Sequence, residues 1–557
     1  MVAESDPHAN RRRSSVGAVE VPESLVREHE GSPLQLDGMT DADKALAAQF
    51  GYKPVFKREF GYLSTFSFAV SISGLFSTTA TTFTYPLTSG GASAVVWCWL
   101  ISGAGCMCIA CSVAELVSAY PTCGGLYYTV SRLCSKEWAP SISWVDGWLN
   151  LLGQVAGVAS SEYGSAQLLL AAVSMGSDFR YQPSTEATVG VMAALTVLCG
   201  FVNSMSTYWM EKITKGYVIF HVLVLVSCCI ALLAMTDNKH DASYVFTHTE
   251  STTGWQPIGW SWLFGFLSVS WTMTDYDATA HITEEINEPE IKAPWCISAA
   301  MAFTYVGGFL YNIVLAFCMG DPAEILASPM AQPVAQIFYN SLGKAGGIFY
   351  TVCAFIILQT LCWSATQSLA RTVFAYSRDR LIPGSHLWTK IDKRTGTPIY
   401  AVWFSIFWCI AINLIGLGSY TAIAGVFNAC AIALDWSYII PIFCKMTSGR
   451  FERGPWHMGA ASWLVNAWAC IWTVFVSIIF ILPTERPTTA ANMNWAIVYL
   501  MAVIIFSMIC WWLGANKFYT GPLVETEVSN SENGDGSRSS TEKYDEKGTS
   551  GAEVKSS

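Results

Sequence analysis

A short polar segment inside an apolar stretch holds the residues best suited to chemistry. The chain is apolar from Trp260 to Trp271, and it then places two carboxylates and an imidazole at Asp275, Asp277 and His281. Ionisable groups at membrane depth are costly and normally face protein or a water-filled cavity. An interrupted helix also frees backbone groups that only such surroundings tolerate. We expect a discontinuous helix that contributes to a binding site; the alternative is an ordinary helix end at the membrane surface.

The composition indicates a membrane protein. Of the 557 residues, 52% are hydrophobic and 13% are charged, against about 25% charged in average chains. The net charge of −10 comes mostly from the ends, because residues 1–50 hold nine acids and five bases and residues 521–557 hold eight and four. We therefore expect a lipid bilayer and no nucleic acid as partner.

The sequence offers no sign of an enzyme. It contains no P-loop, no nucleophile–base constellation and no metal-ligand cluster, so we expect no cofactor and no metal. Most of its 18 cysteines lie in apolar runs, where a free thiol packs like a small hydrophobic group. No disulfide framework is expected.

Apolar runs of about 20 residues, the length that crosses a bilayer core, predict 12 transmembrane helices. The runs are 63–86, 93–115, 140–175, 187–206, 214–235, 259–283, 295–319, 345–370, 399–417, 420–444, 460–482 and 494–514. The first and the sixth are interrupted by small and polar residues. They lie five spans apart, which is the spacing that an inverted pair of five-helix units requires.

The loops predict the orientation. With the N-terminus inside, 18 lysines and arginines fall in cytoplasmic segments and four in external ones, so we expect both termini to be cytoplasmic. We divide the chain into a disordered N-terminal tail (1–57), a transporter domain (58–516) and a disordered C-terminal tail (517–557). The acidic segment 284–289 and the basic cluster 378–380 could form contacts at a cytoplasmic gate, or could be solvated loops.

Four stretches resemble the corresponding parts of fungal amino-acid/choline and GABA-type permeases, a family of the amino acid–polyamine–organocation superfamily. They are 271–285 with Pro289, 64–91, 114–128 and 371–379 with Pro383 and Pro398. The resemblance covers roughly residues 55–515. It implies an all-α, LeuT-like five-plus-five inverted repeat with discontinuous helices 1 and 6 and two further C-terminal helices. It also implies a ubiquitin ligase acting on the tails. Separately, the basic and serine residues at 11–15 could be a kinase target or only part of a charged tail.

In the first span, Ser73 and Gly74 are the preferred site residues, with Thr78 as a second choice. Glycine beside hydroxyl residues lets a helix unwind, and the amides at the start of the following half-helix attract a carboxylate. The resemblance places the substrate carboxylate here. Small residues would equally serve close helix packing.

In the sixth span, four residues are candidate substrate ligands. Carbonyls freed from Thr272 onward can accept from an ammonium, Trp271 or Tyr276 can stack on it, and Asp275 can pair with a cation. Simple packing is the alternative for both aromatic residues.

Glu162, in the third span, is a candidate for both substrate binding and proton coupling, because desolvation favours its protonated form. A neutral structural glutamate is equally consistent with the pattern. His221, Asp275 and His281 are the other candidate proton carriers, and the resemblance favours protons over sodium.

We therefore expect a secondary transporter for amino acids or related amino compounds such as GABA, working by alternating access at the plasma membrane or at a vacuolar or other vesicular membrane. A choline, polyamine or nitrogenous-metabolite transporter, importing or exporting, is the alternative. A nutrient receptor that scarcely transports is a third.

Overall fold

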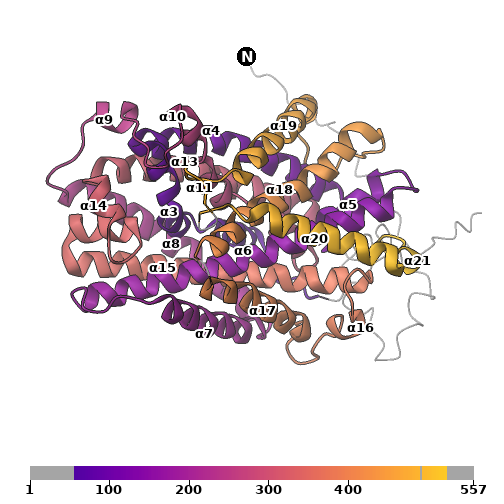
Figure 1. The fold of residues 1–557 in the computed structure, drawn as a ribbon. Coiled ribbons are helices and arrows are strands. Elements are labelled where there is room, and N and C mark those ends of the chain that lie inside the picture. The colour runs from indigo at the N-terminus through magenta and orange to yellow at the C-terminus, as the bar shows by residue number, and fades with distance from the viewer. Residues whose placement is uncertain (1–55, 419, 490–491, 523–557) are drawn as a thin grey trace, which may run out of the picture. The chain divides into compact units, whose positions relative to one another are not determined.

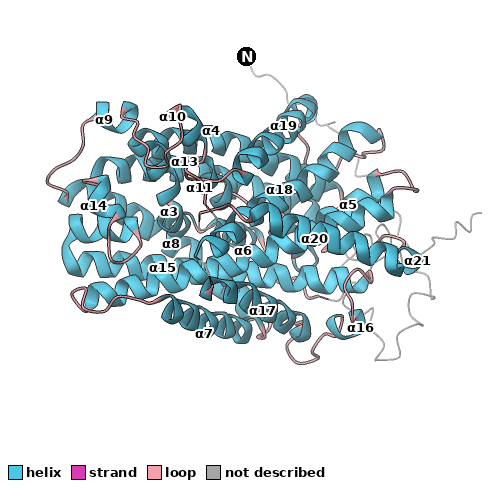
Figure 2. Cartoon of the chain, viewed as in Figure 1, coloured by secondary structure: helices cyan, strands magenta, loops and turns pink. Residues whose placement is uncertain are grey.

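The computed structural model describes residues 56–418, 420–489 and 492–522, and Figure 2 shows that these residues are mostly helical. Within those ranges there is no strand, and one isolated β-bridge pairs Phe60 with Ile286. The predicted all-α class is confirmed for this part of the chain. The predicted tails, 1–57 and 517–557, lie almost wholly outside it, together with the kinase and ubiquitin sites expected there.

Ten helical segments of the described residues are long and apolar enough to cross a membrane. They are α2–α3 (Tyr62–Thr82), α4 (Thr84–Ala119), α7 (Thr185–Asn203), α8 (Thr207–Met235), α13 (Pro289–Cys318), α15 (Pro333–Arg378), α17 with the following 3-10 turn (Ile399–Leu417), α18 (Tyr420–Ser448), α19 with the preceding turn (Gly459–Ile481) and α20–α21 (Ala496–Phe518). Each corresponds to one predicted span. The third and sixth predicted spans are not among the ten.

The third predicted span forms α6 (Ala139–Gly176). Its 38 residues extend over about 57 Å at 1.5 Å per residue, well beyond the roughly 30 Å of a hydrocarbon core. Polar side chains interrupt its apolar surface and are buried, among them Asp146, Asn150, Gln154 and Glu162. Asn150 and Gln154 donate hydrogen bonds to other buried polar groups, so α6 contributes polar contacts to the interior of the bundle.

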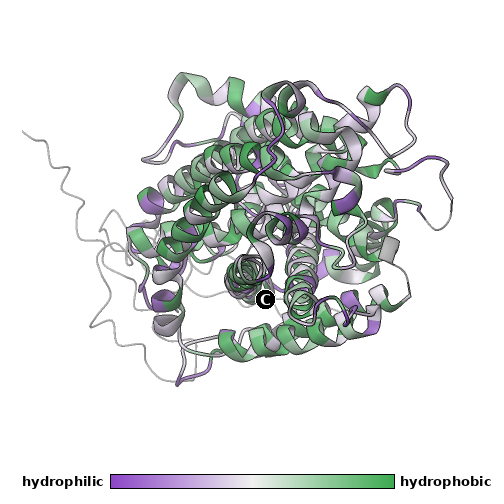
Figure 3. Cartoon of the chain, turned by 90° about the vertical axis from the view of Figure 1, so that its left-hand side faces the viewer, coloured by the Kyte–Doolittle hydropathy of each residue, from purple (hydrophilic) through white to green (hydrophobic). Residues whose placement is uncertain are grey.

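The long helices α6 and α15 pack side by side, and α18 packs on α6 (Figure 1). On another side, α7 and α17 (Ile399–Asn413) pack on each other and on both long helices. Figure 3 shows apolar residues along the helices and hydrophilic residues gathered in many of the loops. In α20 (Ala496–Cys510) only three residues are buried, and so large an exposed apolar surface is suited to lipid.

The first predicted span is broken at Gly74 into α2 (Tyr62–Ser73) and α3 (Leu75–Thr82). Gly74 adopts φ 49° and ψ 32°, the left-handed conformation, which glycine reaches without the steric cost that a Cβ brings. The Gly74 carbonyl accepts from the backbone N–H groups of Ser77 at 2.9 Å and Thr78 at 3.1 Å, which starts α3. The break therefore follows from the residue type.

The sixth predicted span is divided into α10 (Ile258–Leu263), α11 (Phe266–Thr272) and α12 (Ala278–His281). Between α11 and α12 the backbone is irregular, and Asp275 has φ 60°, a conformation that aspartate tolerates better than most residues. Since α11 packs on α3 and α12 packs on α2, the two interrupted helices run next to each other.

Candidate functional site

A small cavity lies where the two helix breaks meet. Its volume is about 30 Å³, room for no more than a few water molecules at about 10–15 Å³ each, so side chains nearly fill it in this conformation. It is lined by Ile72, Thr78, Gly153, Gln154, Gly157, Ser161, Trp271, Thr274, Asp275, Leu361, Ala365, Cys430 and Leu434. Thr78, Trp271 and Asp275 are the predicted site residues in this set.

The other two predicted residues of the first span, Ser73 and Gly74, do not line the cavity. The Ser73 hydroxyl donates to the Val70 carbonyl at 2.9 Å and accepts from Thr304 at 2.8 Å. Thr78 donates to the Ser73 carbonyl at 2.9 Å, which satisfies a group freed by the break. Gly74 contributes its backbone shape, and the Ser73 side chain is engaged in packing α2 against α13.

His221, a candidate proton carrier, holds the start of α3. Its Nε2 atom accepts from the Phe76 backbone N–H at 3.2 Å, and its Nδ1 atom lies 3.1 Å from the Tyr217 hydroxyl. An imidazole nitrogen that accepts a hydrogen bond carries no proton. The geometry is that of a neutral histidine satisfying one of the free donors of a helix N-terminus, which gives His221 a structural role.

Trp271 separates the small cavity from a larger one. The second cavity has a volume of about 270 Å³ and is lined partly by Thr81, Gln167, Trp271 and Phe427. The Trp271 and Phe427 rings lie 6.1 Å apart between centroids. Trp271 therefore borders both spaces.

Two other candidates of the sixth span do not line either cavity. The Thr272 hydroxyl donates to the Ser268 carbonyl of its own helix at 2.8 Å. The Tyr276 ring packs edge-on against Tyr438, with centroids 5.4 Å apart. In this conformation the Tyr276 ring is engaged in packing and the Thr272 hydroxyl in a hydrogen bond of its own helix. The role expected for the Thr272 backbone carbonyl stays a prediction.

Asp275 brings a carboxyl group to the cavity. It is one of the lining residues, and its Oδ1 atom is buried without a hydrogen-bond partner among the described residues. A buried carboxylate oxygen is costly unless it is protonated or meets a donor or cation. The arrangement therefore suits a ligand that carries an ammonium group or another donor.

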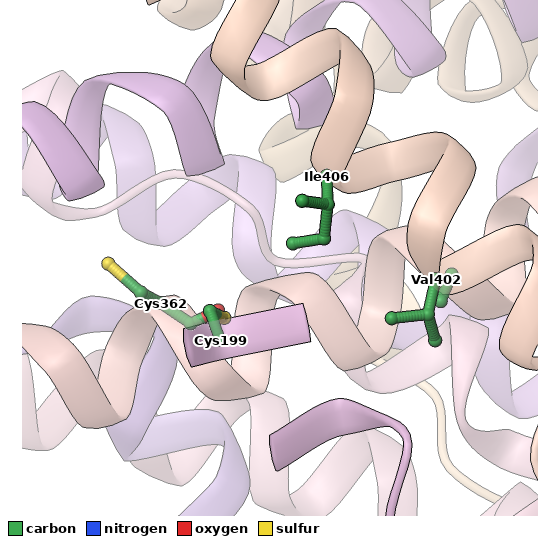
Figure 4. Close-up of a cluster of buried hydrophobic side chains, with 5 residues drawn as sticks. Cys199, Cys362, Val402 and Ile406 are labelled. Carbon is green, nitrogen blue, oxygen red and sulfur yellow. The ribbon is translucent and has the colours of Figure 1, made fainter. Parts of the chain in front are cut away.

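Glu162 lies away from the cavity. It is fully buried, and its neighbour Ser161 lines the cavity while Glu162 does not. Its Oε1 atom accepts from Gln359 at 3.3 Å, and the thiols of Cys199 and Cys362 lie beside the carboxyl group. The two cysteines belong to a buried cluster with Ala370, Val402 and Ile406 (Figure 4). Direct substrate contact by Glu162 would require a different conformation.

Asp277 is a polar centre that the sequence marked as a carboxylate of the interrupted segment but did not predict as a ligand or proton carrier. It is fully buried; Tyr438 donates to its Oδ1 atom at 2.7 Å, and Asn150 donates to its Oδ2 atom at 2.6 Å. His281 Nε2 lies 3.1 Å from the same Oδ2 atom. The spacing of four residues between Asp277 and His281 is one signal that could have found the pair.

Charged residues next to the sixth-span segment pair with α15. Glu285 and Arg371 are 2.7 Å apart, with exposed side-chain fractions of 0% and 1%. Glu284 and Arg378 lie 3.4 Å apart, a contact between the two loop clusters considered in the sequence. Arg371 is the partner that sequence reasoning missed, because the sequence does not show which basic residue of α15 faces the acidic turn.

The chain is similar to known permeases over most of its length. The family model described as amino acid permease matches residues 60–504. An uncharacterised amino-acid permease of Schizosaccharomyces pombe is 55% identical over 89% of this chain and 92% of its own length. Amino-acid permease 2 of Neurospora crassa is 48% identical over 87% and 90%. The amino-acid permease BAT1 of Arabidopsis thaliana is 30% identical over 87% and 96%.

Proposed function

The chain belongs to the amino acid permease family and is an integral, multi-pass membrane protein, and we propose that it transports amino acids or related small amino compounds such as GABA as a secondary active transporter. The names of its relatives support the amino-acid class. The finer assignments, which are the substrate, the coupling ion and the membrane, rest on the arguments below.

The observation that carries the proposal is the cavity between two broken helices with Asp275 in its wall. The start of α3 carries partial positive charge that favours a carboxylate, and Asp275 favours an ammonium. An amino acid presents both groups. The volume of about 30 Å³ is too small for such a molecule, so its entry requires side chains such as Leu361 and Trp271 to move.

The larger cavity supports alternating access. It offers about 270 Å³ on the far side of Trp271, so a substrate could wait there before the aromatic pair opens. Charged pairs hold the other side closed, as at Glu285 and Arg371. In this conformation the small cavity would then be closed on the side where Glu285 and Arg371 lie.

We propose the architecture of 12 transmembrane helices, with α6 as the third and α10–α12 as the sixth. Breaks in the first and sixth helices fit two inverted five-helix units followed by two further helices. Two contacts support a common outer end: Lys344 pairs with Asp178 at 2.5 Å, and Arg486 lies over the Trp255 ring at 3.6 Å. The 12-span assignment with cytoplasmic termini places Lys344 and Arg486 in external segments, and it places Asp178 and Trp255 in external segments as well. The two contacts are therefore consistent with cytoplasmic termini.

Proton coupling and a plasma-membrane location complete the proposal, with a vacuolar or other vesicular membrane as the second choice of location. Among the candidate carriers, Asp275 and His281 belong to the interrupted sixth helix. Glu162 lies behind the cavity, and His221 holds the start of α3. A proton gradient would drive accumulation of a substrate that enters from the acidic side.

One observation favours a second cargo class. A carboxylate with an unpaired buried oxygen and an indole in the same wall, at Asp275 and Trp271, would suit an organic cation such as choline or a polyamine. In that case Asp275 would be the main ligand and the start of α3 would contribute little.

Competition uptake in a permease-deficient yeast tests the proposal. Labelled GABA is offered with unlabelled proline, choline or putrescine at two external pH values. Inhibition by the zwitterion with faster uptake at acid pH supports a proton-coupled amino-acid importer. Competition by choline or putrescine alone would move the cargo to cations. Absence of any uptake by protein present at the cell surface would contradict import.

A further inference from the structure

Asp277 and His281 form a buried pair whose hydrogen bonds determine where its protons can be. Both side chains have an exposed fraction of 0%. The His281 Nδ1 atom lies 2.8 Å from the Cys123 carbonyl oxygen. A carbonyl can only accept, so Nδ1 carries a hydrogen. The imidazole therefore has one further position for a proton, the Nε2 atom that faces Asp277.

The contact between His281 Nε2 and Asp277 Oδ2, at 3.1 Å, needs one proton between the two atoms. With a proton on either atom, the pair has a net charge of zero and the contact is a hydrogen bond. Without it, two lone pairs would face each other in a buried site, and a carboxylate would remain without a counter-charge. The pair thus has one dissociable proton whose loss leaves a net negative charge.

Hydrogen bonds connect this pair to the cavity. Asn150 donates to Asp277 Oδ2 at 2.6 Å, and its own Oδ1 atom accepts from Gln154 at 2.9 Å. Gln154 lines the cavity, and so does Asp275, which lies two residues before Asp277. Asp277 is therefore connected to the cavity wall in two ways. The first is the backbone that it shares with Asp275, and the second is the hydrogen-bonded side chains of Asn150 and Gln154.

The groups that face the pair come from every neighbouring element. They are the Tyr438 hydroxyl of α18, the Tyr376 ring of α15, the Asp146 carboxyl of α6 and the Asp275 carboxyl of the pair's own segment. On the remaining side, Gly125 has φ 60°, and a Cβ on it would lie 2.7 Å from His281 Cε1. The loop that supplies the Cys123 carbonyl thus packs tightly on the imidazole ring.

We propose that the Asp277–His281 pair carries the coupling proton and that Asp275 makes its occupancy depend on substrate. The inference rests on the proposed proton-coupled transport of amino compounds. When the pair holds its proton, Asp275 can be ionised and pair with the substrate ammonium. When the proton is lost, the pair gains a net negative charge beside an ionised Asp275 in a buried site, which is unfavourable. Proton and substrate therefore favour each other's binding.

Opening of the inner side provides a route for proton release. A movement of the sixth-helix segment away from the 122–125 loop would break the bond from His281 Nδ1 to the Cys123 carbonyl. Water could then reach the imidazole, and the proton would leave together with the substrate. Loss of the proton leaves the pair with a net negative charge, which repels an ionised Asp275 and disfavours rebinding of the substrate.

The test uses purified full-length protein in liposomes with a pH-sensitive dye inside. Substrate-driven internal acidification and labelled-substrate exchange are measured in parallel, with GABA or another amino acid that the uptake competition shows to be carried. Asp277→Asn and His281→Asn should each retain exchange and lose substrate-driven acidification by about 100-fold or more, the lower range for a lost proton-transfer group. The double variant should lose no more than either single variant, since the pair acts as a unit.

The outcomes separate this inference from the function on which it rests. If the unaltered protein acidifies the liposomes and Asp277→Asn does so equally, the pair is not the carrier and the proposed transport stands. If the unaltered protein exchanges substrate without acidification, proton coupling itself is wrong, and the inference falls with it. Exchange by each variant shows that it has folded, and two separate substitutions keep the test decisive if one variant misfolds.

Discussion

Leu361 of α15 lies directly against Gly74: a Cβ added to that glycine would be 2.7 Å from the Leu361 Cδ1 atom. Leu361 also lines the small cavity. Leu361 therefore packs against the break in the first helix and lines the candidate site at the same time. Any side chain at position 74 must displace Leu361 and must also adopt φ 49°, which is strained for residues other than glycine.

Gly74→Leu should abolish transport while the protein still reaches the cell surface. The added side chain would push into the cavity wall and straighten or shift the break, and misplacement of binding groups by about 1 Å can lower activity by about 10²-fold. Uptake per molecule of surface-labelled protein measures the effect. Gly61→Ala is the matched control, because a Cβ there has no neighbour within 4 Å. Full activity in Gly74→Leu would contradict the assignment of the substrate site to the break in the first helix.

Trp271→Ala should raise the KM for uptake by about three- to tenfold, the range expected when an aromatic contact to a cation is lost. It should also speed the escape of bound substrate, because the indole separates the two cavities. Trp271→Phe retains an aromatic ring and should behave closer to the unaltered protein. Initial uptake rates over a range of substrate concentrations provide the comparison. An unchanged KM in Trp271→Ala would mean that the indole only fills space.

Much of this arrangement could be predicted from local sequence. Gly74 sits among hydroxyl residues, and Asp275 interrupts an apolar run; both features alter the helix within a few residues of themselves. Residue type decides such breaks, because glycine and aspartate enter the left-handed region more easily than others. The sequence could therefore point to both helix interruptions before any tertiary contact was known.

The partners of the buried polar groups could not be predicted in the same way. Asp277 meets Asn150 and Tyr438, which are distant in sequence, and which side of each helix faces the other depends on packing. Glu162 shows the same dependence on packing, and its role stays a prediction. Its position in a long polar-containing helix suggested a ligand, but one residue of helical rotation, from Ser161 to Glu162, turns the side chain from the cavity to the cysteines beside it.

Glu162→Gln should leave the KM and the pH dependence of uptake unchanged. The carboxyl group does not line the cavity, and its bond from Gln359 at 3.3 Å can be replaced by an amide contact. Uptake measured from acid to neutral external pH, side by side with Asp277→Asn, is the relevant experiment. A flattened pH profile in Glu162→Gln with a normal profile in Asp277→Asn would assign the proton to the third helix instead.

Arg371→Ala should destabilise the protein strongly. The guanidinium group lies 2.7 Å from Glu285 with an exposed fraction of 1%, and removing one partner of a buried ion pair leaves the other charge uncompensated, at a cost of about 3–5 kcal/mol. Arg371→Met combined with Glu285→Gln removes both charges and should recover part of the loss. Thermal unfolding in detergent, followed by the fluorescence of a thiol-reactive dye, gives the midpoints for a double-mutant cycle of Arg371→Met, Glu285→Gln and their combination.

The control for that cycle is the exposed pair of Lys344 and Asp178, which are 2.5 Å apart. Their side chains are 40% and 65% exposed, so water and salt screen the attraction. Lys344→Ala should therefore shift the unfolding midpoint far less than Arg371→Ala, although the charge lost is the same. Equal shifts in the two variants would show that burial of the Glu285–Arg371 pair does not determine its contribution. The pair would then be an unsuitable candidate for holding the inner side of the permease closed.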